Sequence, residues 1–378
     1  MWPSLMASTI TRSSGSQNFE LSSSKQVSPS AERHFVHQNT YKLFISSWNV
    51  GGITPPEQLN TDNWFDSQKH TADIYVFGFQ EIVPLNAGNI LGAENSRISL
   101  QWNSLIGAAL NKTVPPLEKI EEAEVEEYQR TPPVKEHNPA DASRSQGFQC
   151  IISKQMVGIF RSVWVRTNLC SYVRHPSVSC VSCGIMGLLG NKGSVSIRFF
   201  LHETSFCFVC SHLASGGKQG DEKHRNADAT EILSRTRFPQ GRSHGLPRKI
   251  LDHDRVIWLG DLNYRIHLAE ATTRSLVKKK QWSILLQNDQ LRSEFMEGHV
   301  FEGWQEGVIE FAPTYKKGKR THTPAWCDRI IWFRRGLKQH EYSRGESRLS
   351  DHKPVRAIFT AQVDVLEPMG RSNEKSFL

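Results

Sequence analysis

Hydrophobic and polar residues follow one another along the chain in a pattern that favours strands over helices. Short apolar runs closed by polar residues, the pattern of buried strands, occur at residues 42–46, 74–79, 155–166, 193–200, 204–210, 256–259, 329–333 and 355–361. Helical patterns are fewer and cover residues 99–111, 221–234 and, with internal breaks, 268–289. We therefore expect two sheets packed face to face and covered by helices.

The chain is organised as one domain between two tails. Residues 1–38 are rich in Ser and other small polar residues without periodicity, which predicts a disordered tail. The folded domain is expected over residues 39–364, and residues 365–378 form a C-terminal tail. Within the domain, residues 117–146 turn acidic and then Pro-rich, which indicates a flexible surface insertion.

Composition and charge narrow the class of protein. Of 378 residues, 38% are hydrophobic and 22% charged, which excludes a disordered or collagen-like chain. No run of eighteen apolar residues occurs, so we expect no spanning helix. The net charge of +8 favours anionic partners such as phosphorylated ligands, nucleic acid or an acidic lipid surface. Neither a secretory signal nor a prenylation box is visible, so we expect a cytoplasmic protein.

The 7 cysteines are odd in number and scattered, which favours reduced thiols over a disulfide framework. Two pairs, Cys180 with Cys183 and Cys207 with Cys210, have the spacing of zinc knuckles. The second pair falls in a predicted buried strand, where residues three apart point to opposite faces. Buried core cysteines are therefore the preferred interpretation.

Polar clusters stand at the ends of several predicted strands, where loops carry function on a rigid scaffold. Asp261 and Asn263 follow one apolar run two residues apart, so they can aim at one point, orient a water and hold a phosphate oxygen. An Asx turn that ends the strand is the alternative. Glu81 follows another strand and suits Mg²⁺, which takes one or two carboxylates and keeps several waters. A solvated carboxylate is the alternative there.

Two histidines stand in similar positions. His212 and His352 follow a Ser and an Asp at the edges of apolar segments, and each can donate a hydrogen bond to an anionic oxygen or exchange protons near neutral pH. With 15 histidines in the chain, structural roles are the alternative. Asp328 lies at the entry to an aromatic strand and is placed to orient a partner such as an imidazole, unless it only pairs with Arg329 at the surface.

Taken together and in their order along the chain, the polar clusters and the residues around them resemble the inositol polyphosphate 5-phosphatases of the endonuclease/exonuclease/phosphatase superfamily, over about residues 40–362. The two most specific motifs are VIWLGDLNYRI at residues 256–266 and TPAWCDRIIW at residues 323–332. Supporting motifs are GFQEIV, SKQMVGIF, GIMGLLGNKGSVS, SHLASG, FAPTYK and SDHKPVRA. The resemblance implies an α/β protein with the DNase I-like four-layer sandwich, in which helices flank two packed mixed β-sheets.

The resemblance also implies an activity. The protein is expected to be a Mg²⁺-dependent phosphoric monoester hydrolase, which removes the 5-phosphate by in-line attack of an activated water. Its expected substrates are phosphoinositides, such as phosphatidylinositol 4,5-bisphosphate and 3,4,5-trisphosphate, and soluble inositol polyphosphates. The expected role lies in phosphoinositide signalling.

By family analogy, the polar clusters receive roles. Glu81 binds the metal, with Asn49 and Asp351 close by. Asp261 positions or deprotonates the attacking water, and Asn263 and His212 bind the scissile phosphate. His352, oriented by Asp328, stabilises charge on the phosphoryl group.

The resemblance implies further residues that meet the neighbouring ring phosphates. They are Tyr315, Lys316, Lys192, Arg225, Asn226 and Arg320. The chain departs from the family pattern here: His322 stands where Arg is usual, the stretch between Lys316 and Pro324 is short, and Lys317 and Leu188 replace an aromatic and a basic residue. These departures concern recognition of the adjacent 4-phosphate.

Partners and alternative functions follow from the charge. Basic runs at residues 278–280, 316–320 and 334–335 predict either peripheral contact with anionic membranes or solvated faces. A nuclease of the same superfamily is an alternative that the basic charge favours, although the motif set disfavours nucleic acid. A non-catalytic phosphoinositide-binding protein is another, which His322 and the short loop favour.

Overall fold

The computed structural model describes residues 34–56, 59–62, 64–65, 71–92, 96–111, 147–184, 189–240, 245–315 and 323–368. Residues Val36–Leu366 form a compact unit. The first strand begins at His34, within the segment predicted as a tail. The predicted insertion at 117–146 lies outside the described residues, as do Leu188 and the segment from Lys316 to His322, which includes Lys317 and Arg320.

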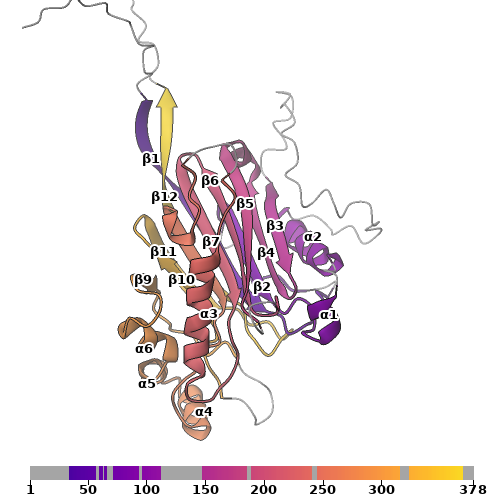
Figure 1. The fold of residues 1–378 in the computed structure, drawn as a ribbon, viewed down its shortest axis with the longest axis vertical. Coiled ribbons are helices and arrows are strands. Elements are labelled where there is room, and N and C mark those ends of the chain that lie inside the picture. Colours follow the sequence, from indigo (N-terminus) through magenta and orange to yellow (C-terminus); the bar gives the residue numbers. More distant parts are fainter. Residues whose placement is uncertain are drawn as a thin grey trace, which may run out of the picture. The chain divides into compact units, whose positions relative to one another are not determined.

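Two six-stranded sheets form the centre of the unit (Figure 1). The first has the strand order β11-β12-β1-β2-β4-β3. Its strands are β1 (His34–Asn49), β2 (Ile74–Gln80), β3 (Phe148–Met156), β4 (Ile159–Arg166), β11 (Leu337–Arg344) and β12 (Val355–Pro368). The β1–β2 pair is parallel, whereas β2–β4, β3–β4 and β11–β12 are antiparallel, so the sheet is mixed.

The second sheet has the strand order β5-β6-β7-β8-β10-β9. Its strands are β5 (Val173–Ser182), β6 (Gly193–Leu201), β7 (Thr204–His212), β8 (Arg255–Asp261), β9 (Trp304–Glu306) and β10 (Asp328–Phe333). β7 and β8 are parallel, and the other pairs are antiparallel. Each sheet therefore carries a parallel pair whose two carboxyl ends lie at one edge.

The apolar faces of the two sheets pack against each other. Ile45 and Val76 of the first sheet share one buried cluster with Phe208 and Leu259 of the second. This central core makes the two sheets inner layers of a sandwich.

Helices cover the outer faces, as Figure 1 shows for α2 and α3. In α2 (Arg97–Asn111), Trp102, Ile106 and Leu110 recur every four residues and are buried against the first sheet. In α3 (Asp221–Arg235), Ala229 and Ile232 pack on the second sheet. The remaining helices are α1 (Ala87–Leu91), α4 (Glu270–Lys278), α5 (Trp282–Gln287) and α6 (Gln290–Met296), with short 3₁₀ helices at Thr167–Tyr172 and Ile250–Asp252. The predicted four-layer architecture is confirmed.

Several element boundaries differ from the sequence predictions. The single strand predicted over residues 155–166 is wrong, because Val157 and Gly158 form a turn between β3 and β4, and Val157 has a φ of 53°. Three strands, β5, β9 and β11, were absent from the prediction. β5 and β11 are edge strands with few buried residues, so they lack the apolar runs that identify the central strands.

Two expectations about the class of protein can be checked on the fold. All seven cysteines are free thiols, and Cys207 and Cys210 are buried in β7 as predicted for core residues. Among the described residues, no group of cysteines lies close enough together to hold a metal ion. No described helix combines the length and the apolar character needed to cross a membrane.

Candidate active site

Four strand ends bring polar side chains to one edge of the two sheets. Asn49 ends β1 and Glu81 directly follows β2, while His212 ends β7 and Asp261 ends β8. His212 and Asp261 are partners in the β7–β8 register. The Asn49 amide nitrogen lies 3.0 Å from Asp261 Oδ2, so the polar ends of the two sheets contact each other directly.

The Asn49 side chain holds two carboxylates side by side. Its Nδ2 donates to Asp261 Oδ2 and, over 3.2 Å, to Glu81 Oε1, while its Oδ1 accepts a hydrogen bond from the backbone of Gly51. Glu81 adopts a left-handed backbone conformation with a φ of 53°, which turns the chain sharply after β2. Asn49 therefore fixes the spacing of Glu81 and Asp261.

These residues fit a divalent cation. Glu81 keeps 30% of its side chain exposed, whereas Asn49 and Asp261 beside it are almost fully buried. A hard divalent cation takes carboxylate oxygens and can retain waters on its open side, which suits a carboxylate at the surface. Because the Asn49 oxygen bonds to Gly51, Glu81 is the direct protein ligand that this arrangement offers. Asp351 lies on the loop beside Gly51, where Ser350 Oγ donates to it over 3.4 Å.

Asp261 is an ionised carboxylate among cationic and donor groups. Burial by itself would raise the pKa of Asp261, but His352, His212, Lys192 and the Asn49 amide together hold it well below its usual range. Its Oδ1 accepts a hydrogen bond of 3.1 Å from the backbone of Asn263. Asp261 therefore presents a fixed negative charge that can orient a water or accept its proton.

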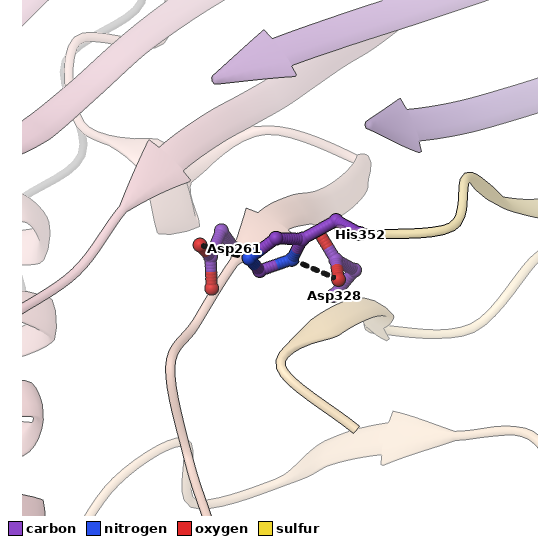
Figure 2. Close-up of side chains that lie close together, drawn as sticks. All are labelled: Asp261, Asp328 and His352. Atoms are coloured by element: carbon purple, nitrogen blue, oxygen red, sulfur yellow. Dashed lines mark hydrogen bonds and ion pairs between the residues drawn. The ribbon is translucent and has the colours of Figure 1, made fainter. Parts of the chain in front are cut away.

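His352 lies between two carboxylates, as Figure 2 shows. Its Nδ1 is 2.8 Å from Asp328 Oδ2, and its Nε2 is 3.9 Å from Asp261 Oδ2. Burial would lower the pKa of His352, but Asp328 and Asp261 outweigh it and raise the value to about 9. The ring is therefore an imidazolium at neutral pH. The sequence prediction that Asp328 orients an imidazole agrees with this contact.

The same three residues have ligand atoms close enough to hold a metal ion, and they are the one such group of acidic, His and Cys residues in the described part of the chain. A protonated imidazole already satisfies both carboxylates, however, and it repels a cation. We therefore interpret Asp261, His352 and Asp328 as a network of ion pairs that keeps His352 protonated. Glu81 is then the residue placed to bind the metal.

His212 is a neutral imidazole, in contrast to the protonated His352. Its Nε2 lies 2.5 Å from Lys192 Nζ and 3.4 Å from Asp261 Oδ2. Burial, with the charge of Lys192, lowers the pKa of His212 to about 3, so the ring is neutral. Burial also lowers the pKa of Lys192. A neutral imidazole nitrogen that faces a lysine ammonium accepts a hydrogen bond, so His212 holds Lys192 in place beside Asp261.

Arg265 belongs to the site although sequence reasoning did not assign it a role. Its Nη2 donates to Asn263 Oδ1 over 2.6 Å, and its guanidinium lies 5.0 Å from the centre of the Tyr315 ring. Asn263 Nδ2 donates to the Leu213 carbonyl over 3.1 Å. The Asn263 amide is thus oriented from both ends. The signal available in the sequence was only that Arg265 falls within the same motif.

Tyr315 lies beside His352, and its predicted contact with a ring phosphate stays a prediction. Its ring is 4.7 Å from the ring of His352, and burial raises the pKa of Tyr315 to about 12. The phenol therefore stays protonated and can donate a hydrogen bond. Of the residues predicted to contact ring phosphates, Tyr315 lies beside His352 and Lys192 lies beside His212.

Arg225 and Asn226 are directed elsewhere. Arg225 is fully buried and donates to Gln290 over 2.7 Å and to the Gly216 carbonyl over 3.2 Å. Asn226 donates to Glu294 and accepts from the Tyr264 hydroxyl, each over 2.6 Å. These contacts attach α3 to α6, so substrate contact by the two residues stays a prediction.

Residues 46–358 match the sequence family described as Endonuclease/Exonuclease/phosphatase family 2. The chain is 52% identical to the type IV inositol polyphosphate 5-phosphatase 9 of Arabidopsis thaliana, over 97% of this chain and 92% of that protein. It is 48% identical to the type I inositol polyphosphate 5-phosphatase 8 of the same plant, over 89% and 73%. The chain belongs to the inositol polyphosphate 5-phosphatase family.

A solved structure gives the same result for the fold of this 5-phosphatase. The inositol polyphosphate 5-phosphatase domain of SpSynaptojanin, in complex with inositol (1,4)-bisphosphate and a calcium ion, superposes with a TM-score of 0.71 at 29% identity. The match covers 88% of this chain and 87% of that one. The predicted family, DNase I-like fold and phosphoric monoester hydrolase class are confirmed. The alternatives of a nuclease and a binding-only protein find no support among these relatives.

Proposed function

We propose that this enzyme hydrolyses the 5-phosphate of phosphatidylinositol 4,5-bisphosphate, phosphatidylinositol 3,4,5-trisphosphate and soluble inositol polyphosphates, with Mg²⁺ as its cofactor. The observation that carries the proposal is the position of Asp261, whose Oδ2 lies 3.0 Å from the Asn49 amide nitrogen, 3.4 Å from His212 Nε2 and 3.9 Å from His352 Nε2. Asp261 provides a proton acceptor, and His352 and Lys192 provide charged donors for phosphoryl transfer. Inositol (1,4)-bisphosphate, bound by the synaptojanin relative, carries no 5-phosphate, as expected of a product of 5-phosphate removal.

The side chains divide the reaction between them. Asp261 orients the attacking water and accepts its proton, and its depressed pKa keeps it ionised at neutral pH. Lys192, held by the His212 ring, donates to an oxygen of the scissile phosphate. His352 donates to another oxygen, and Asp328 keeps it charged. When bound at Glu81, the metal would supply neutralisation of charge on the phosphoryl group.

Two further residues, Asn49 and Arg265, hold the reacting side chains in position. Phosphoryl transfer depends mainly on in-line alignment of attacking and leaving oxygens and on charges set in place beforehand. Asn49 fixes Glu81 against Asp261, and Arg265 fixes the Asn263 amide. Asn49, Asp261 and Asn263 are buried, so they hold their geometry before the substrate arrives.

We propose further that the enzyme works in the cytoplasm and contacts anionic membranes at their surface. Seven free thiols support a reducing compartment. Exposed cations at Lys278, Lys279 and Lys280 support the membrane contact, since each cation near an anionic surface contributes roughly 1 kcal/mol. Sedimentation with vesicles that contain or lack phosphatidylserine tests this contact, and equal binding to both would exclude it.

Inorganic phosphate release from phosphatidylinositol 4,5-bisphosphate and from inositol 1,4,5-trisphosphate tests the activity. Release should require Mg²⁺, stop in EDTA and be lost in Asp261→Asn. Asp62→Asn, an exposed residue, is the matched control and should retain activity. Absence of release from both substrates by the folded wild-type enzyme would refute the proposal, and cleavage of plasmid DNA at low enzyme concentration would favour a nuclease.

A further inference from the structure

A cavity is lined by residues that follow α3 and precede β8, within 237–240 and 245–252. Its volume is about 460 Å³, and its lining includes Arg237, Gln240, Pro247, Arg248, Lys249 and Asp252. None of these residues belongs to the active site described above. We call these residues the basic pocket.

The basic pocket and the active site lie at opposite ends of the same strands. β7 and β8 run parallel and end at His212 and Asp261, whereas the basic pocket precedes Arg255, the first residue of β8. At about 3.3 Å per residue, the length of β8 separates the two sites by roughly 20 Å. A ligand in the basic pocket therefore cannot touch the catalytic residues.

The charge of the basic pocket is unbalanced. Arg237, Arg248 and Lys249 are exposed cations, and Asp252 is the one acidic residue in the lining. Asp252 is already used by the backbone: its Oδ2 accepts from the backbone nitrogens of Lys249, at 2.8 Å, and Arg248, at 3.2 Å. These bonds, that from Lys249 first, lower the pKa of Asp252. Arg248 and Lys249 are both exposed, so their side-chain charges are accessible to a ligand.

The walls are held by a buried cation. Arg198 of β6 is 2% exposed and donates to the Pro239 carbonyl over 2.6 Å and to the Pro247 carbonyl. It also lies over the Phe238 ring at 5.3 Å, and the Phe238 backbone bonds to that of Arg248. Arg198 Nε is buried and has no partner among the described residues. Arg198 therefore joins both walls and adds positive charge beneath them.

We propose that the basic pocket binds a soluble polyanion that carries two or more phosphate groups on a ring of inositol size. Arginine pairs bidentately with phosphate, and lysine adds a point charge, so Arg237, Arg248 and Lys249 together match several phosphates. A volume of about 460 Å³ lies in the range of small-molecule sites. A lipid headgroup has the same chemistry. In an enzyme bound to a membrane, however, the active site would face the lipid and the basic pocket, at the opposite end of β8, would face away from it, which favours a soluble ligand. That choice of source rests on the membrane contact proposed above.

Binding to the full-length chain tests the inference without any turnover. Calorimetric titration of Asp261→Asn with inositol 1,4,5-trisphosphate, in the absence of divalent metal, should show two equivalents bound. Adding Arg248→Glu and Lys249→Glu should remove one equivalent, or weaken it at least about tenfold, and leave the other. The matched control is Arg335→Glu with Lys338→Glu, the same charge change on exposed residues of the β10–β11 turn and of β11, which should keep both equivalents.

Each other outcome overturns the inference. Binding that the Arg248→Glu, Lys249→Glu variant keeps in full means that the basic pocket does not bind, and equal losses in both double variants mean a general charge effect. Vesicles with phosphatidylinositol 4,5-bisphosphate form a second arm; a loss of vesicle binding in the pocket variant alone would assign the surface to lipid. If the double Glu variant melts at a lower temperature, Arg248→Gln with Lys249→Gln replaces it. Failure of the catalytic proposal would leave these binding results unaffected.

Discussion

Asp328 and His352 form a buried ion pair in which carboxylate Oδ2 and ring Nδ1 are 2.8 Å apart. Thr314 donates to the same carboxylate oxygen over 2.8 Å, so the carboxylate is itself held in place. Removal of two such charges from water costs several kcal/mol, which the pair recovers only when its geometry is well fixed. The pair keeps a positive charge on His352, at a distance of 3.9 Å from Asp261.

Asp328→Asn should therefore change both the rate and its dependence on pH. Without the carboxylate, the pKa of His352 falls from about 9, because the largest raising contribution comes from Asp328. The rate at neutral pH should drop by about 10²–10⁴-fold, and the alkaline limb of kcat/KM should move to lower pH. Thr314→Val, which keeps the carboxylate, is the control and should leave the limb in place. An unchanged limb in Asp328→Asn would show that His352 does not titrate in catalysis.

The same raised pKa makes a contribution to stability that depends on pH. A His whose pKa is higher in the folded than in the unfolded protein stabilises the fold fully below about pH 6.5, and this stabilisation is lost as the pH rises toward about 9. Wild-type protein should accordingly lose more free energy of unfolding over this interval than His352→Gln. Urea unfolding at several pH values measures the difference. Parallel curves for the two proteins would contradict the assigned direction.

Glu81 should determine the affinity for metal. Glu81→Gln removes the charge of the exposed carboxylate and retains its shape, so half-maximal activity should need at least about tenfold more Mg²⁺. Asp351→Asn on the neighbouring loop should have a smaller effect, because Asp351 lies beside Gly51 and not against Asn49. Titration of phosphate release with Mg²⁺ measures both. If Asp351→Asn has the larger effect, the ligand assignment of the two residues must be exchanged.

The sequence predicted the central strands better than the edges. β2, β7 and β8 are buried on both faces, and their continuous apolar runs are unambiguous. Edge strands β5 and β11 bury few side chains, and the turn at Val157 carries no Gly-Pro or Asn-Gly signal in front of it. The pattern of hydrophobicity therefore identifies the strands that form the core, but not the edge strands or the turns.

The site shows the same limit. Strand ends are visible in the pattern, so His212 and Asp261 were singled out from the residues, whereas Asn49 received its role from the family resemblance; parallel pairing then brings the strand ends together. The direction of a side chain is set by tertiary contacts, so the family resemblance named Arg225 without indicating its bonds to Gln290 and Gly216, and sequence reasoning gave Arg265 no role. A helical argument was available for Arg225, which shares the buried face of α3 with Ala229 and Ile232 at spacings of three and four residues.

Arg265→Lys should impair turnover more than binding. Lysine cannot reproduce the two bonds that Arg265 makes, from Nη2 to Asn263 Oδ1 and from Nε to the Asn263 carbonyl, or the planar contact with Tyr315. The Asn263 amide should then lose its fixed orientation, and kcat should fall about tenfold or more with a smaller change in KM. Arg274→Lys in α4 is the matched control. A rise in KM at constant kcat would instead assign Arg265 to substrate binding.

A buried cation far from solvent gives a prediction about stability. Arg161 in β4 is fully buried, and its Nε, Nη1 and Nη2 have no hydrogen-bond partner among the described residues. Its cross-strand neighbour is Gly78, where a Cβ would lie 2.7 Å from Cys210 Sγ. Burial lowers the pKa of Arg161 to about 10, and its one aromatic contact is the Phe208 ring at 5.4 Å.

Arg161→Met should stabilise the fold by about 1–3 kcal/mol, because it removes buried donors that lack acceptors and keeps most of the side-chain volume. The lost cation–π contact is worth less, roughly 1–2 kcal/mol, and the Met thioether also packs well on Phe208. Arg198→Met is the matched comparison: that guanidinium bonds to the Pro239 and Pro247 carbonyls, so its loss should destabilise the protein. Urea unfolding midpoints order the three proteins. Destabilisation by Arg161→Met would mean that the guanidinium has a bound water or anion as its partner between the sheets.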